Sequence, residues 1–178
     1  MSQRLKSCLE FIQREGVVSV FPAKGKRALP SLFRFLHPRS TFSWVWDENG
    51  DDKVVKLWWL KNEIAASKKV LYGRFFTNQP VFVSFAKAKE LRAQIQRSPL
   101  GEVERYILEL LEQNSPQTLR MMKRQARLDG RDFLRSEWQK ALLKVQKQFL
   151  ICSLGDSTRE SGPMPSTEYV ALEHFFDL

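Results

Sequence analysis

The side chains of this sequence that are best suited to chemistry are basic, and they gather in residues 115–150. That segment carries nine basic and three acidic side chains, whereas residues 98–114 and 151–178 on either side are acidic. A positive block confined to one region is typical of a surface that binds a polyanion. The residues that we expect to contact nucleic acid are Arg120, Lys123, Arg124, Arg127, Arg131, Arg135, Gln139, Lys140, Lys144 and Lys147.

These side chains suit two kinds of contact with DNA. Arg and Gln near the start of a helix that enters a groove can form paired hydrogen bonds with base edges. Lysines further along such a helix suit phosphates, which carry no sequence information. A solvated charged helix face explains the same residues without a ligand. Asp156 and Glu160, opposed only by Arg159 in the same stretch, argue against phosphate contact there.

Three aromatic side chains are candidates for stacking on an extruded or unpaired base, and they are Trp58, Trp59 and Tyr72. The alternative is that they form the core of the first half of the chain. Neighbouring residues on a helix point about 100° apart. At least one of the two tryptophans is therefore exposed, or both pack between the two halves.

No constellation for catalysis or metal binding emerges from the remaining residues. His37 and His174 lie in unrelated contexts, so a Ser/His/Asp arrangement has no support. Cys8 and Cys152 fall in apolar patterns and are expected to be buried. The acidic turn at residues 47–52 lacks the distal Glu of a calcium loop. We therefore expect no catalytic residue, no metal and no cofactor.

Spacing of apolar residues in the first half predicts a mixture of helices and short strands. A helical pattern covers residues 4–15, and a strand pattern follows at residues 17–21. A second helix is expected over residues 57–66. Strands at residues 70–76 and 81–85 flank a turn and read as a hairpin.

Pro99 and Gly101 interrupt the helical pattern and mark the best boundary along the chain. We place a small N-terminal α+β domain at residues 1–97 and a second domain at residues 98–178. The fold class is therefore α+β. Three helices followed by a two-stranded ribbon predict a winged helix-turn-helix domain for the second unit.

The three helices of this second unit are expected over residues 102–113, from Ser115 to about 127, and over 131–148. Strand patterns follow at residues 149–154 and 167–172. The buried face of the third helix is predicted to consist of Leu134, Trp138, Leu142, Val145 and Phe149.

Composition excludes several classes of protein. Apolar residues make up 43% of the 178 residues, which is enough for a core, and the net charge is +9. No apolar run approaches the roughly 20 residues that span a membrane. The first residues, MSQRLKSCLE, lack the apolar stretch of a secretory signal. We expect a cytoplasmic protein without a membrane partner.

The sequence also resembles a known family. The segment WWLKNEIAASKKVLYGRFFTNQPVFVSF at residues 58–85 looks like a segment of bacterial AlkZ-related proteins. REGVVSVFP at residues 14–22, LPSLFRFL at 29–36 and LLKVQKQFLI at 142–151 fit the same pattern. The resemblance implies a short winged-helix relative of DNA glycosylases that excise alkylated or crosslinked bases.

The resemblance also exposes a departure from the enzymes. Those glycosylases carry a Gln-x-Gln or Gln-x-Asp motif in their N-terminal half. Residues 1–97 of this sequence have no such motif at the position where the family carries it. Gln94-Ile95-Gln96 and Gln146-Lys147-Gln148 have the spacing but fall at helix ends.

We therefore expect a double-stranded-DNA-binding protein, repair-associated or regulatory, without evident catalytic residues. A reduced base-excision glycosylase and a protein-docking module remain the alternatives, and a homodimer or a protein partner stays open.

Overall fold

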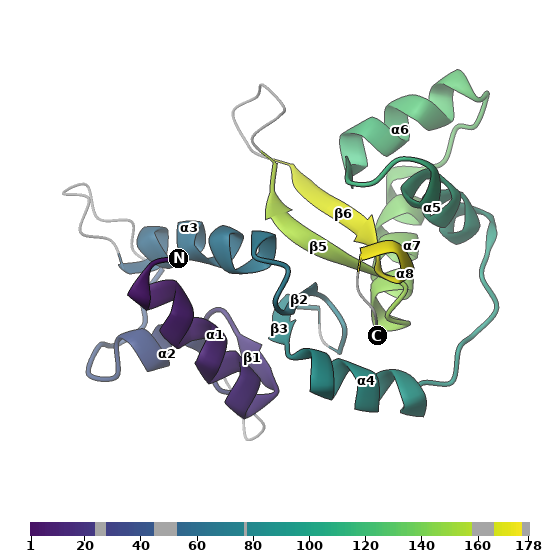
Figure 1. The fold of residues 1–178 in the computed structure, drawn as a ribbon. Coiled ribbons are helices and arrows are strands. Elements are labelled where there is room, and N and C mark those ends of the chain that lie inside the picture. The colour runs from purple at the N-terminus through teal and green to yellow at the C-terminus, as the bar shows by residue number, and fades with distance from the viewer. Residues whose placement is uncertain (24–27, 45–52, 77, 158–165, 176–178) are drawn as a thin grey trace.

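The computed structural model describes residues 1–23, 28–44, 53–76, 78–157 and 166–175 (Figure 1). It is mixed α+β, which confirms the predicted class. The elements in chain order are α1 (Gln3–Glu15), β1 (Val17–Ser19), α2 (Leu32–Leu36), α3 (Lys53–Ala66), β2 (Leu71–Gly73), β3 (Val81–Val83), α4 (Phe85–Gln94), α5 (Glu102–Gln113), β4 (Gln117–Thr118), α6 (Leu119–Leu128), α7 (Arg135–Lys147), β5 (Ile151–Asp156), β6 (Thr167–Ala171) and α8 (Leu172–Phe175).

The first sheet is antiparallel and has the strand order β1-β3-β2. Its β2–β3 pairing confirms the predicted hairpin, with Tyr72 opposite Phe82. On the other edge, Val18 of β1 also lies opposite Phe82. Gly16 has a φ of 76° and donates its N–H to the carbonyl of Ile12, which ends α1 and turns the chain into β1.

The second sheet has the order β4-β6-β5 and accompanies helices α5, α6 and α7. The predicted succession of three helices and a hairpin is therefore present. The short strand β4 was not predicted. It pairs with β6 through Gln117 and Thr118, between α5 and α6.

Two predicted helix starts in this part are wrong. Ser115 does not cap α6, because the chain forms β4 first and the Thr118 hydroxyl accepts from the N–H of Met121 instead. Helix α7 begins at Arg135 rather than at residue 131. Leu134 is extended at its N-cap and donates its N–H to Glu137, so its side chain is 68% exposed instead of buried. The other four predicted core residues are buried.

Among the described residues, three apolar clusters form the core, and the third contains residues from both halves of the chain. Leu71, Phe75 and Val83 of the first half pack there with Phe149 and Cys152 of the second. The rings of Phe75 and Phe149 stack with centroids 4.4 Å apart. This packing brings the β5–β6 hairpin between α3 and α6, as Figure 1 shows. The division into folding units at residue 97 stays a prediction.

Candidate functional site: a cavity between the halves and a basic groove

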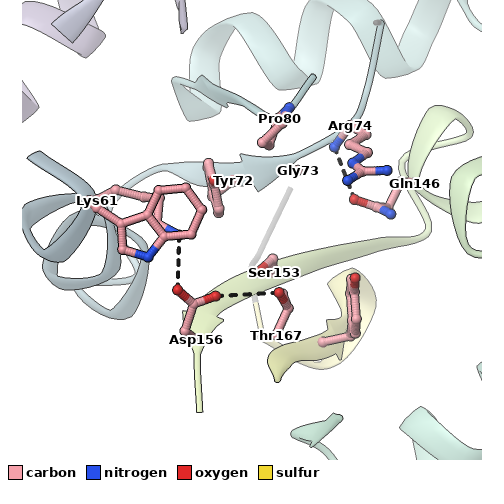
Figure 2. A pocket seen from close by; sticks show the side chains of 11 residues that line it. Lys61, Tyr72, Gly73, Arg74, Pro80, Gln146, Ser153, Asp156 and Thr167 are labelled. Atoms are coloured by element: carbon pink, nitrogen blue, oxygen red, sulfur yellow. Dashed lines mark hydrogen bonds and ion pairs between the residues drawn. The ribbon is translucent and has the colours of Figure 1, made fainter. Parts of the chain in front are cut away.

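A cavity of about 430 Å³ lies between α3 and β2 on one side and α7, β5 and β6 on the other (Figure 2). Its volume falls in the range of small-molecule sites. Both halves of the chain are needed to form it. The residues that line it are Trp58, Lys61, Tyr72, Gly73, Arg74, Pro80, Gln146, Ser153, Asp156, Thr167 and Tyr169.

A buried ion pair forms one end of the cavity. Lys61 Nζ lies 3.0 Å from Asp156 Oδ2, and the two side chains are 5% and 9% exposed. Asn62 binds Asp156 twice, since its Nδ2 donates to Oδ2 and its Oδ1 accepts the backbone N–H of Asp156. The Thr167 hydroxyl contacts the other carboxylate oxygen at 3.4 Å, as drawn in Figure 2. Asp156 is thereby fixed by groups from α3 and β6.

Burial shifts the pKa values of Lys61 and Tyr72, both of which line the cavity, in opposite directions. It lowers the pKa of Lys61, and the hydrogen bond and charge of Asp156 offset part of that effect. Burial raises the pKa of Tyr72, and the negative charge of Asp156 adds to the shift. Tyr72 is therefore a neutral phenol at physiological pH.

The three aromatic candidates are not brought together. Trp58 and Tyr72 line the cavity, whereas Trp59 does not and is 57% exposed. Lys61 Nζ lies 3.7 Å from the centroid of the Trp58 ring and 5.9 Å from that of Tyr72. The ammonium group thus covers one face of Trp58 in a cation–π contact. Base stacking between Trp58 and Tyr72 stays a prediction, and Lys61 would have to move for it.

Gln146 ties α7 to β2 across the cavity. Its Oε1 accepts the backbone N–H of Arg74 at 2.9 Å, and its Nε2 donates to the carbonyl of Leu142. Gly73 makes this approach possible, because an added Cβ would lie 3.1 Å from Gln146 Oε1. Gln148 donates to the carbonyl and hydroxyl oxygens of Ser98. Both glutamines of this Gln-x-Gln sequence therefore make structural hydrogen bonds.

The thiol of Cys152 is fully buried on β5, and burial raises its pKa from 9.0 to about 12. The unfolded thiol ionises first, so this group stabilises the fold below pH 9.0 and its contribution falls as the pH rises above that value. We expect a loss of about 1.4 kcal/mol per pH unit from this thiol. Urea unfolding at pH 8 and above pH 9 should show a shallower pH slope for Cys152→Ala than for the wild type. Equal slopes would contradict the assignment.

A second hollow, of about 700 Å³, is lined by the basic side chains of α6. Arg120, Lys123, Arg124 and Arg127 all face it, and Ser166 closes it at the start of β6. Lys123 is half-buried and the three arginines are exposed. In the part of the chain that the structure describes, Lys123, Arg124 and Arg127 make no ion pair. We call this surface the α6 groove.

Two of the predicted contact residues instead face the acidic helix α5. Arg131 pairs with Glu102 at 3.6 Å and lies over the ring of Tyr106. Lys144 pairs with Glu104 at 3.7 Å and donates to the carbonyl of Pro99. The remaining predicted residues lie on α7 outside the α6 groove and are exposed, and they are Arg135, Gln139, Lys140 and Lys147.

Asp156 changes the charge expected for the hairpin loop. Its carboxylate is buried at the cavity, where the ammonium group of Lys61 balances its negative charge. It therefore does not oppose phosphate contact in the way that the sequence suggested. Arg159 and Glu160 lie outside the described residues.

Comparison with known proteins bears on the whole of this arrangement. The family model described as AlkZ related matches residues 3–178, which include both halves, the cavity and the α6 groove. The chain belongs to the AlkZ-related family. Among curated proteins, none matches it. The family match confirms the resemblance seen in the sequence.

In this AlkZ-related protein, the sequence did not single out Lys61, and it singled out Asp156 only as an acidic residue that opposes phosphate contact, not as the partner of Lys61. A signal for Lys61 was present, because it continues the apolar stripe of α3 formed by Val54, Leu57 and Ile64. A lysine in such a stripe must be paired when buried. Asp156 gave no comparable signal, since its partner lies on α3, 95 positions away in the sequence.

Across the described ranges, no group of three or more His, Cys, Asp and Glu residues is arranged to hold a metal ion. None of the helices within those ranges has the length and apolar character needed to cross a membrane.

Proposed function

We propose that this AlkZ-related protein binds double-stranded DNA through a winged helix formed by α5–α7 and β4–β6. In a helix-turn-helix, the first helix of the pair crosses the DNA backbone and the second enters the major groove. The element order supports α6 for the first role and α7 for the second. Such a protein acts on the genome, in repair or regulation, and we place it in the cytoplasm.

The α6 groove is the observation that carries this proposal. Four basic side chains of one helix share a concave surface that ends at the loop end of the β5–β6 hairpin, where Ser166 precedes β6. Within the described ranges Lys123, Arg124 and Arg127 make no ion pair, and such guanidinium and ammonium groups suit the phosphates of a duplex. The exposed Arg135 and Gln139 in the first turns of α7 suit base edges.

The bonding of Gln146 and Gln148 supports a function without base hydrolysis by these glutamines. A glutamine that orients water needs an amide group directed at that water. Here the amides are hydrogen-bonded to Arg74, Leu142 and Ser98. Gln94 and Gln96, the other pair with this spacing, are exposed at the end of α4.

Fluorescence anisotropy of a labelled duplex of about 25 base pairs, measured over a series of salt concentrations, tests the proposal. Each neutralised phosphate contributes about −0.9 to the slope of log K against log salt, so Lys123, Arg124 and Arg127 alone predict a slope of about −2.7 or steeper. Binding should survive excess heparin. A flat slope, or complete displacement by heparin, would overturn DNA binding and favour a docking role for the winged helix.

A further inference from the structure

The amine of Lys61 is placed as a nucleophile rather than as a surface charge. Its side chain is 5% exposed, the residue lines the cavity, and its Nζ lies 3.7 Å from the centroid of the Trp58 ring. When a lysine is removed from water, the charged ammonium becomes less favourable relative to the neutral amine. Buried lysines therefore serve in Schiff-base chemistry, which requires the neutral amine. Burial lowers the pKa of Lys61 in this direction.

Asp156 supplies the proton acceptor that such an amine requires. Its Oδ2 lies 3.0 Å from Nζ, within reach for direct proton transfer. Asn62 and Thr167 hold the carboxylate in place from two sides. An ammonium group can therefore pass one proton to Asp156 and become a neutral amine without leaving the cavity.

We propose that Lys61 forms a Schiff base with the open-chain aldehyde of a deoxyribose that has lost its base. The inference rests on the proposed binding of DNA, because it names the sugar that such a partner would present. Once Asp156 has taken one proton from the ammonium, the neutral amine of Lys61 bonds to the aldehyde carbon, the carbonyl π bond opens, and one amine proton moves to the oxygen to give a carbinolamine. Asp156 then returns its proton to the carbinolamine hydroxyl, which leaves as water, and a protonated carbon–nitrogen double bond remains.

The position of the cavity favours a sugar of DNA over an unrelated aldehyde. Ser166 lines the α6 groove and its neighbour Thr167 lines the cavity, so both hollows border the start of β6. Arg74 is exposed at the cavity and offers a guanidinium to a flanking phosphate. One face of Trp58 is already covered by Lys61, which leaves less room for a base than for a bare sugar.

Borohydride trapping tests this inference, because hydride reduces the double bond to a permanent secondary amine. Two probes are used with the full chain: a duplex with one abasic site, and free 2-deoxyribose 5-phosphate. We expect a covalent adduct with both, and peptide mass mapping of the wild-type adduct should place it on Lys61. Lys61→Arg keeps the charge and should abolish the adduct, whereas Lys89→Arg, an exposed lysine of α4, should leave it unchanged.

The two probes separate the inference from the proposed function. An adduct at Lys61 with the free sugar phosphate, but no binding of intact duplex, would support the amine chemistry and overturn the DNA partner. Duplex binding without any adduct, or adducts spread over surface lysines, would overturn the Schiff base and leave the proposed function standing. Mapping on the wild type decides the matter even if Lys61→Arg fails to fold.

Discussion

Replacing Lys123, Arg124 and Arg127 together by glutamine should lower the affinity for duplex DNA by about 10²- to 10³-fold near 0.1 M salt. Each phosphate contact contributes roughly 0.9 decades of affinity at that salt concentration, and three are removed. The slope of log K against log salt should become shallower by about 2.7. Glutamine has a helix propensity similar to those of Lys and Arg, so α6 should stay folded.

A matched control separates the α6 groove from the overall charge. Arg4, Lys6 and Arg14 are exposed on α1, and their replacement by glutamine removes the same charge from one helix. This control variant should keep a salt slope close to that of the wild type. Equal losses in the two variants would mean that net charge alone attracts DNA and that α6 is not the contact surface.

Asp156→Asn should lower the free energy of unfolding by about 3–5 kcal/mol, because it leaves the Lys61 ammonium buried without its counter-charge. Both side chains of the pair are under 10% exposed, so water cannot replace the lost partner. Urea unfolding followed by circular dichroism measures the change. Lys61→Met combined with Asp156→Asn should recover part of the loss, since no unpaired charge remains.

An exposed pair provides the control for that measurement. Lys87 and Glu90 form an ion pair at 2.7 Å on α4, with side chains 37% and 52% exposed. Glu90→Gln should cost no more than about 1 kcal/mol, as is typical of surface pairs. A similarly small cost for Asp156→Asn would show that the pair across the cavity is hydrated and contributes little.

Local patterns in the sequence predicted most of the elements but fewer of the contacts. Helix α5 begins and ends where its apolar spacing indicates, because Gly101 before it and Asn114 after it interrupt the pattern. The β2–β3 hairpin is likewise a local structure. Strand β4 escaped prediction because it has two residues and depends on pairing with Tyr169 and Glu168, more than 40 positions later.

The site divides in the same way. The basic residues of α6 follow one another on one helix, so sequence spacing alone was enough to place four of them together. The ion pairs of Arg131 and Lys144 could not be predicted, because their partners Glu102 and Glu104 belong to another helix. The cavity could not be predicted either, because its walls come from two distant segments of the sequence, residues 58–80 and 146–169. The one local indication of the cavity was Lys61, a lysine in line with the apolar residues of α3.

The apolar cluster shared by the two halves couples their stability. Phe149 and Cys152 of the second half are fully buried against Leu71 and Phe75 of the first, so loss of structure in either half uncovers apolar surface on the other. That exposure is unfavourable in water. Cooperative unfolding therefore extends across the boundary between the two halves, where the cavity lies. Fluctuations that open the cavity widely would expose the same apolar surface to water and are therefore unfavourable. The ion pair of Lys61 and Asp156 also joins the two halves, so separating them breaks this pair as well as the shared apolar cluster.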